Sequence, residues 1–177
     1  MRIIIDAGHG GEDPGAVGEY SQEKDITLRI SNVLNALLQI EGFETKMTRE
    51  KDCKPSWEDR VESTEEDIFV SIHCNAVEQR DIQGIETYHY KTSKAGKKLA
   101  ELAQDNLINS TNRLDRGAKG SKELYVLRKT KCPAILVESG FISNLEEEQL
   151  LNTLNLQAKV AVSIAQAIKE YSNGSNG

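Results

Sequence analysis

Short runs of β-branched residues alternate with longer stretches of helical periodicity along almost the whole chain, and this alternation restricts the fold more than any other feature. Strands separated by helices form a largely parallel sheet with helices packed against it. The sequence therefore predicts an α/β fold in a single domain, with a mostly parallel twisted sheet of about six strands and helices on both faces. The expected strands are Arg2–Ala7, Glu44–Thr48, Ile68–Cys74, Ile85–Tyr90, Leu124–Leu127 and Ala134–Ser139.

Apolar residues between these strands recur at every third or fourth position, as on the buried side of a helix. A further short helix is expected after Asn144, because Glu147 follows three residues later in the pattern of a capping box. The chain of 177 residues has the size of one domain, which we place at residues 1–171. Residues 172–177 have the composition of a flexible linker and form a tail. The expected longer helices are Glu23–Ile40, Trp57–Glu66, Ser93–Asn109 and Leu156–Tyr171.

Charge and apolar content exclude several kinds of function. The net charge of -6 and the absence of a Lys/Arg cluster argue against a nucleic-acid partner. No stretch approaches the roughly 18 apolar residues of a membrane span, and the N-terminus lacks the apolar segment of a secretory signal. We therefore expect synthesis in the cytoplasm, no membrane insertion and a monomer. The three cysteines are too few and too scattered for a disulfide framework, so we expect them to be unpaired.

Two of the three histidines lie where predicted strands end. His9 comes just after the strand Arg2–Ala7, and His73 lies at the end of the strand that begins at Ile68. Ligands of open α/β sheets bind at the carboxyl edge, so the two imidazoles can meet there. Neutral imidazole is the commonest zinc ligand in proteins, although a single histidine is more often a packed or surface residue.

A catalytic zinc ion usually takes three protein ligands, and two histidines with one carboxylate are a standard set. Glu23 is the candidate carboxylate, because it begins the helix that follows the glycine-rich loop around His9. An acidic residue is also favoured there simply by the helix dipole. Spacing alone does not decide between these readings, and Glu12, Asp13 and Asp25 are alternatives.

Glu138 is the candidate general base. It ends the apolar run that begins at Ala134, and an ionised carboxylate in such a place must be paired, hydrated or functional. A glutamate beside a zinc-activated water can take its proton and pass it to the leaving amine.

Other hydrolase types lack their sequence patterns. Cys74 is adjacent to His73, but neighbouring residues of a strand point to opposite faces and do not make a nucleophile and base pair. The G-x-S-x-G elbow and the H-E-x-x-H zinc motif are absent from the sequence. His89 lies within a predicted strand, where an ordinary structural position is expected.

The chain resembles the catalytic domain of zinc-dependent N-acetylmuramoyl-L-alanine amidases, and the resemblance runs nearly end to end. Each motif alone is weak, but their order along the chain is highly specific. Cys74 stands where alanine is common in the family, and Ser139 where several small residues occur. The matching motifs include residues 5–11, 23–25, 48–49, 71–76, 84–88, 116–117, 124–128 and 133–144.

The resemblance implies that Zn²⁺ is held by His9, Glu23 and His73 and that Glu138 is catalytic. The implied reaction is cleavage of the amide between N-acetylmuramic acid and L-alanine in peptidoglycan. Alternatives are a stem-peptide endopeptidase, a deacetylase or a non-catalytic wall-binding module.

The short segment 76–83 leaves no room for the inserted inhibitory helix of some members. The chain therefore resembles a bacteriophage endolysin that acts on the cell wall after release, with a wall-binding domain after the tail; a bacterial autolysin is the alternative.

Overall fold

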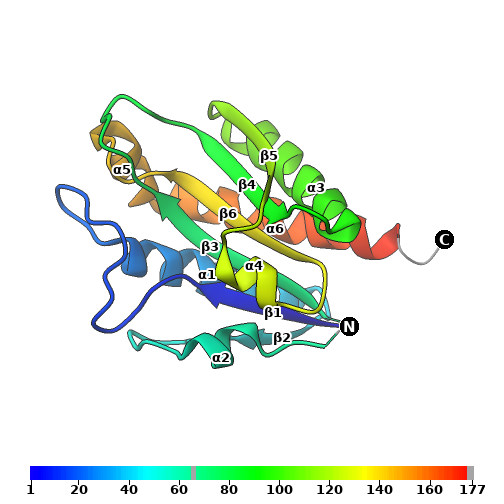
Figure 1. The fold of residues 1–177 in the computed structure, drawn as a ribbon. Coiled ribbons are helices and arrows are strands. Elements are labelled where there is room, and N and C mark those ends of the chain that lie inside the picture. The colour runs from blue at the N-terminus through cyan, green and yellow to red at the C-terminus, as the bar shows by residue number, and fades with distance from the viewer. Residues whose placement is uncertain (65–66, 175–177) are drawn as a thin grey trace.

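The computed structural model describes residues 1–64 and 67–174, and it confirms the α/β class predicted from the sequence. A six-stranded sheet has the order β2-β1-β3-β6-β4-β5 (Figure 1). The first four of these strands run parallel to one another. β4 pairs with β6 in antiparallel fashion, and β5 pairs with β4 in parallel. The strands are β1 (Arg2–Ala7), β2 (Glu44–Met47), β3 (Ile68–Asn75), β4 (Ile85–Tyr90), β5 (Asp115–Ser121) and β6 (Ala134–Phe141).

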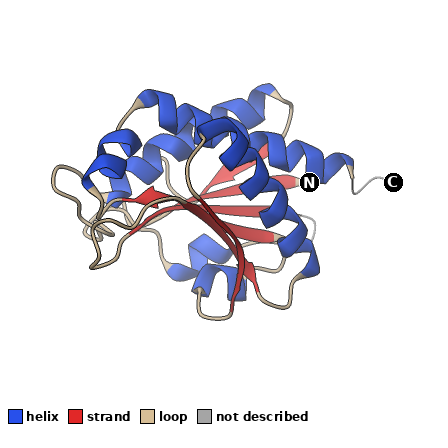
Figure 2. Cartoon of the chain, turned by 90° about the horizontal axis from the view of Figure 1, so that it is seen from above, coloured by secondary structure: helices blue, strands red, loops and turns tan. Residues whose placement is uncertain are grey.

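Helices cover both faces of the sheet, as Figure 2 shows, but they cover them unequally. The long helices α1, α3 and α6 pack together on one face, while the short helices α2 and α4 lie on the other. The site described below lies on the face with the two short helices. The helices are α1 (Glu23–Ile40), α2 (Trp57–Val61), α3 (Lys94–Thr111), α4 (Tyr125–Lys129), α5 (Leu145–Leu151) and α6 (Leu154–Asn173).

The central strands are buried on both sides, which explains their continuous apolar sequence. Ile3, Ile4 and Ile5 are each at most 1% exposed although they point alternately to the two faces. The larger apolar cluster lies under the long helices. A smaller cluster, centred on Phe69 and Leu136, lies under α2 and α4. The site is therefore built on a rigid sheet.

The expected strand Leu124–Leu127 is wrong. This segment leads into α4, one helical turn that buries Val126 and Leu127 against the sheet. The fifth strand is instead Asp115–Ser121, whose sequence is polar and contains two glycines. It lies at an edge of the sheet, where polar residues are favoured and the apolar pattern of a buried strand is lacking.

Several elements begin or end at other residues than expected. α2 ends at Val61, earlier than expected, and residues 65–66 of the predicted helix lie outside the described part. α6 continues to Asn173 and so takes two residues from the expected tail, of which residues 175–177 are not described. Asn144 caps α5 as predicted, but the Glu147 side chain bonds to the Phe141 and Gly84 amides rather than closing a capping box. None of the described helices has the length and apolar character to cross a membrane.

Candidate metal centre and its surroundings

The carboxyl ends of three parallel strands bring the expected site residues to one edge of the sheet. β1 lies beside β3, and β3 lies beside β6. His73 and Glu138 are direct register partners, so their side chains stand on the same face of neighbouring strands. His9 follows two residues after the end of β1.

Two imidazoles and one carboxylate converge at this edge. The Glu23 carboxylate lies between the rings, with Oε2 3.1 Å from His9 Nε2 and Oε1 2.8 Å from His73 Nδ1. One potential ligand atom from each residue lies within 4.8 Å of the others. The ring centroids are 5.0 Å apart and the ring planes nearly perpendicular, at 80°. This donor set and spacing suit one divalent cation with zinc-like ligand preferences.

Glu23 is fixed by main-chain donors as well as by the imidazoles. The amide of Cys74 donates to Oε1 at 2.9 Å, and the amide of Ala16 donates to Oε2 at 2.8 Å. Burial favours the neutral acid, but hydrogen bonds with His73 and His9 outweigh it and lower the pKa of Glu23 well below its usual range. The carboxylate is therefore ionised and oriented, as a metal ligand must be.

The alternative acidic residues lie outside this cluster of donor atoms. Asp13 contacts the other ring nitrogen of His9, with Oδ1 3.1 Å from Nδ1. Such a partner fixes the ring orientation and leaves Nε2 facing the cluster. Glu12 instead pairs with Lys54 at 3.2 Å. Asp25 is not among the residues whose donor atoms converge there.

Two arginines hold the main chain around His9, and sequence reasoning did not assign them. His9 has a φ of 61°, an uncommon value for a residue other than glycine. Arg60 donates to its carbonyl oxygen at 2.6 Å and to the buried Asp6 carboxylate at 2.6 Å. Arg49 donates to the carbonyl oxygens of Ala7 and Gly8 at 3.0 and 2.9 Å. The strained turn is thus held from outside, as is common at functional sites.

Two glycines leave the space that the site side chains occupy. A methyl group on Gly8 would lie 2.5 Å from Cε1 of the His73 ring. A methyl group on Gly15 would lie 2.5 Å from the His9 ring and 2.6 Å from the Glu23 carboxylate, and its φ of +67° is itself unfavourable for other residues. Glycine at positions 8 and 15 is therefore a packing requirement of the site.

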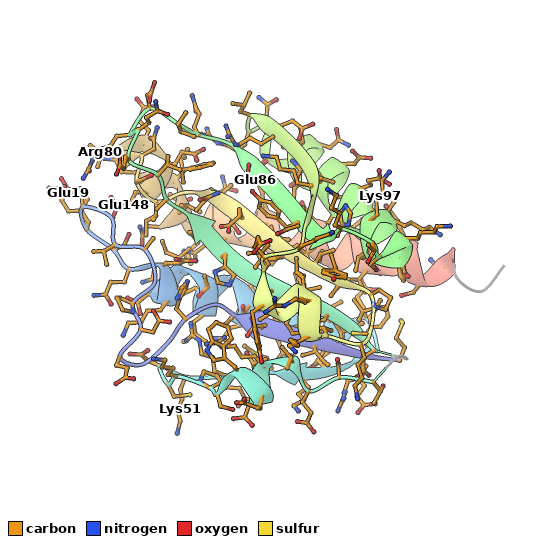
Figure 3. All side chains as sticks on the ribbon, viewed as in Figure 1. Glu19, Lys51, Arg80, Glu86, Lys97 and Glu148 are labelled. Carbon is orange, nitrogen blue, oxygen red and sulfur yellow. The ribbon has the colours of Figure 1, made fainter. Side chains whose placement is uncertain are left out.

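Glu148 anchors the loop that supplies the Ala16 amide. Its carboxylate accepts hydrogen bonds from the amides of Glu19 and Tyr20, at 2.9 and 2.8 Å, and from the Ser21 hydroxyl at 2.7 Å. The labelled Glu19 and Glu148 lie together at one end of the molecule in Figure 3. Burial raises the pKa of Glu148, but the three donors outweigh burial and the net effect lowers it.

Glu138 has an oxygen that the surrounding protein leaves without a partner. Its Oε2 is buried and accepts no hydrogen bond from the described residues. Burial raises the pKa of Glu138 to about 7, although the nearby His73 opposes this change. A buried, partnerless acceptor beside a ligand cluster fits a site meant to contain a cation and water. A carboxyl group that titrates near neutral pH is suited to general acid and base chemistry.

A charged group lies on the other side of Glu138. Glu86 on β4 is its antiparallel register partner and is 2% exposed. The Glu86 carboxylate accepts from Arg116 Nε at 3.0 Å and from Lys119 Nζ at 2.5 Å, and also from the Tyr88 hydroxyl. Figure 3 labels Glu86 on β4. Arg116, Lys119 and Glu86 together carry two positive charges and one negative charge.

The cysteines and His89 stand apart from the candidate chemistry. All three cysteines are free, as expected. Burial raises the pKa of the Cys74 thiol well above its usual value and that of Cys132 to about 11. Thiols of this kind are poor nucleophiles. His89 is a buried strand residue whose Nδ1 contacts the Tyr90 carbonyl oxygen at 2.9 Å.

Comparison with known proteins gives a consistent result over nearly the whole chain. A family model described as N-acetylmuramoyl-L-alanine amidase matches residues 3–170. The uncharacterized protein YqiI of Bacillus subtilis is 37% identical over 96% of this chain and 84% of its own length. The amidase LytC of the same organism is 35% identical, but the chain covers only 35% of that longer protein.

A solved structure shows the same architecture. The catalytic domain of CwlV, an N-acetylmuramoyl-L-alanine amidase from Paenibacillus polymyxa, superposes with a TM-score of 0.90 at 34% identity. The superposition covers 97% of this chain and 98% of that domain.

Proposed function

This chain belongs to the N-acetylmuramoyl-L-alanine amidase family, and from that premise we propose that it hydrolyses the amide joining N-acetylmuramic acid to L-alanine in peptidoglycan. His9, Glu23 and His73 hold a zinc ion, and Glu138 is the general base and acid. The observation that carries the proposal is the cluster of three ligand atoms within 4.8 Å beside a carboxylate oxygen that has no partner. A purely wall-binding module has no need of this combination.

The division of roles follows from the contacts of each side chain. His9 directs Nε2 to the cluster because Asp13 contacts its Nδ1. Glu23 contributes the negative charge of the ligand set, which its two amide donors keep in place. When bound, zinc would supply Lewis-acid chemistry, lowering the pKa of a water molecule and polarising the substrate carbonyl.

Glu138 is responsible for the movement of protons. Its free Oε2 accepts a proton from the attacking water and then returns it to the nitrogen of the leaving L-alanine. The main-chain geometry supports this assignment, because Glu138 is fixed on β6 directly beside His73 on β3. A residue on a central strand keeps its position during the reaction better than one on a loop.

The products of digestion distinguish an amidase from a stem-peptide endopeptidase and from a deacetylase. Purified walls of known composition are digested, and the soluble products are identified by mass spectrometry. Stem peptides with a free L-alanine amino terminus, absent when a chelator is added, are the expected result. Release of acetate would indicate a deacetylase, and peptides cut internally would indicate an endopeptidase; either would refute the amidase proposal.

A further inference from the structure

A cavity of about 540 Å³ opens directly beside the candidate metal centre, a size typical of ligand-binding pockets. His9, His73 and Leu136 of β6 are among the residues that line it. Residues of the two short helices, α2 and α4, supply a further wall of the cavity. A ligand in this cavity therefore touches both the reacting centre and a wall to which the chemistry above gives no role.

Two aromatic rings form that wall. Trp57 at the start of α2 and Tyr125 at the start of α4 have ring centroids 5.0 Å apart. Trp57 remains 57% exposed although it faces the cavity. A large exposed indole in a concave site offers a flat apolar surface with one polar N–H group, which is typical of a recognition surface rather than a core position.

Charged and polar side chains surround the apolar wall. Lys54, Glu58 and Asp13 belong to the same cavity, beside Pro55 and Val126 of its apolar lining. A pyranose ring has matching chemistry, since it presents a face of C–H groups bordered by hydroxyl and amide groups. A flat aromatic surface beside positively and negatively charged side chains therefore suits a sugar ring.

The opposite side of Glu138 has different chemistry. Arg116 and Lys119 share the Glu86 carboxylate there, and side chains of this kind bind carboxylate groups. The strand order places β4 and β5 on one side of β6, whereas β3 and β1 lie on the other, under the cavity. The site thus has an aromatic side and a cationic side, with Glu138 between them.

We propose that the wall of Trp57 and Tyr125 binds a sugar ring of the glycan strand, so that the glycan occupies the aromatic side of the site. This inference rests on the amidase function proposed above and assigns an orientation to its substrate. The peptide that leaves is then on the side of Arg116 and Lys119. The alternative orientation, with the stem peptide against Trp57, is an outcome of the test.

The sequence contains a single tryptophan, Trp57, so fluorescence excited at the red edge of absorption, where tyrosine absorbs little, reports on this wall alone. The probes are a peptide-free disaccharide of N-acetylglucosamine and N-acetylmuramic acid and, separately, a free stem peptide. We expect the disaccharide to shift or quench the emission in a saturable manner and the peptide to have little effect. A response to the peptide with none to the disaccharide would overturn the proposed orientation, and so would no response to either.

Variants separate binding from folding. Calorimetric titration of Trp57→Ala with the disaccharide should show affinity reduced about tenfold or more, the usual effect of truncating a central aromatic contact. Trp57→Phe should recover part of the affinity because it restores a flat ring. Tyr20→Ala is a matched control, since Tyr20 is 76% exposed and does not line the cavity.

Binding of a peptide-free sugar requires no turnover, so these results are independent of the reaction itself. Unchanged disaccharide affinity in a folded Trp57→Ala protein would contradict the inference while leaving the amidase proposal intact. Conversely, a digest without free L-alanine ends would defeat the amidase proposal whatever the fluorescence shows.

Discussion

Arg60 donates a hydrogen bond of 2.6 Å from Nη2 to the carbonyl oxygen of His9, the residue whose φ of 61° aims its ring at the candidate metal centre. The same guanidinium pairs with Asp6, which is 1% exposed. One buried cation thus connects the stability of the sheet edge with the orientation of a proposed ligand.

Substitution of Arg60 should separate these two effects. Arg60→Ala leaves the Asp6 carboxylate without its ion pair and should reduce the free energy of unfolding by about 3–5 kcal/mol. Arg60→Lys keeps a charge for Asp6 but loses the fork that reaches His9, so zinc affinity should fall about 10–100-fold with a smaller loss of stability. Zinc titration and chemical denaturation measure both, with Arg29→Lys at an exposed position as the control. Wild-type zinc affinity in Arg60→Lys would refute the positioning role.

Gly8→Ala should disturb His73 through contact alone. The added methyl group would lie 2.5 Å from the imidazole, so we expect the ring to be displaced and zinc affinity to fall by about 10–100-fold. Gly42→Ala is the control for adding a methyl group without a clash. Its φ of +85° is unfavourable for alanine, but the methyl group would meet no neighbouring atom. Equal zinc affinities for the two variants would contradict the steric explanation.

Glu148 should make stability depend on pH in the acid range. Its pKa is lowered in the folded protein, so its stabilising effect is present above the unfolded value of about 4.3 and is lost as the pH falls through the folded value. At neutral pH, Glu148→Gln should cost about 1–3 kcal/mol, as expected for hydrogen bonds to a charged acceptor. Urea denaturation at pH 7 and at pH 3 measures the difference, which should shrink at the lower pH. A difference that grows on acidification would be contrary to this account.

The cysteines should be dispensable for turnover. Cys74 and Cys132 are buried with raised pKa values, and Cys53 is half-buried. Iodoacetamide should therefore react at Cys53 first and at the other two only after unfolding, with lytic activity retained. Peptide mapping identifies the modified positions, and Cys53→Ser is the control. Complete inactivation that Cys53→Ser does not prevent would point to a thiol with a role in the site.

The parts of the fold that were predictable are those with strong local patterns. The sequence predicts both ends of β1 and of α1 correctly, because an apolar run defines the strand and a helical repeat of apolar residues defines the helix. The sequence does not predict β5, because an edge strand can be polar. It wrongly predicts a strand at Leu124–Leu127, because a short apolar run fits a strand or one helical turn equally well. Local pattern thus identifies buried strands more readily than edges.

Some residues of the candidate site are likewise predictable from the sequence and others are not. Strand ends indicated His9, His73 and Glu138, whereas spacing left Glu23 open until the family resemblance favoured it. No local pattern indicates Arg49 and Arg60, because the carbonyl oxygens around His9 that they hold lie 41 to 53 positions away in the sequence. The roles of His9, Glu23, His73 and Glu138 remain predictions.

The most direct test measures zinc content and initial lysis rate together for Glu138→Gln and His9→Ala. Glu138→Gln removes the group that accepts the proton but no proposed ligand, so it should retain zinc and thermal stability while turnover falls about 10²–10⁴-fold. His9→Ala should lose zinc and activity together. If Glu138→Gln lost its zinc, Glu138 would be a ligand; if it lysed walls at the wild-type rate, another group would be the base; and full zinc and activity in His9→Ala would place the metal elsewhere.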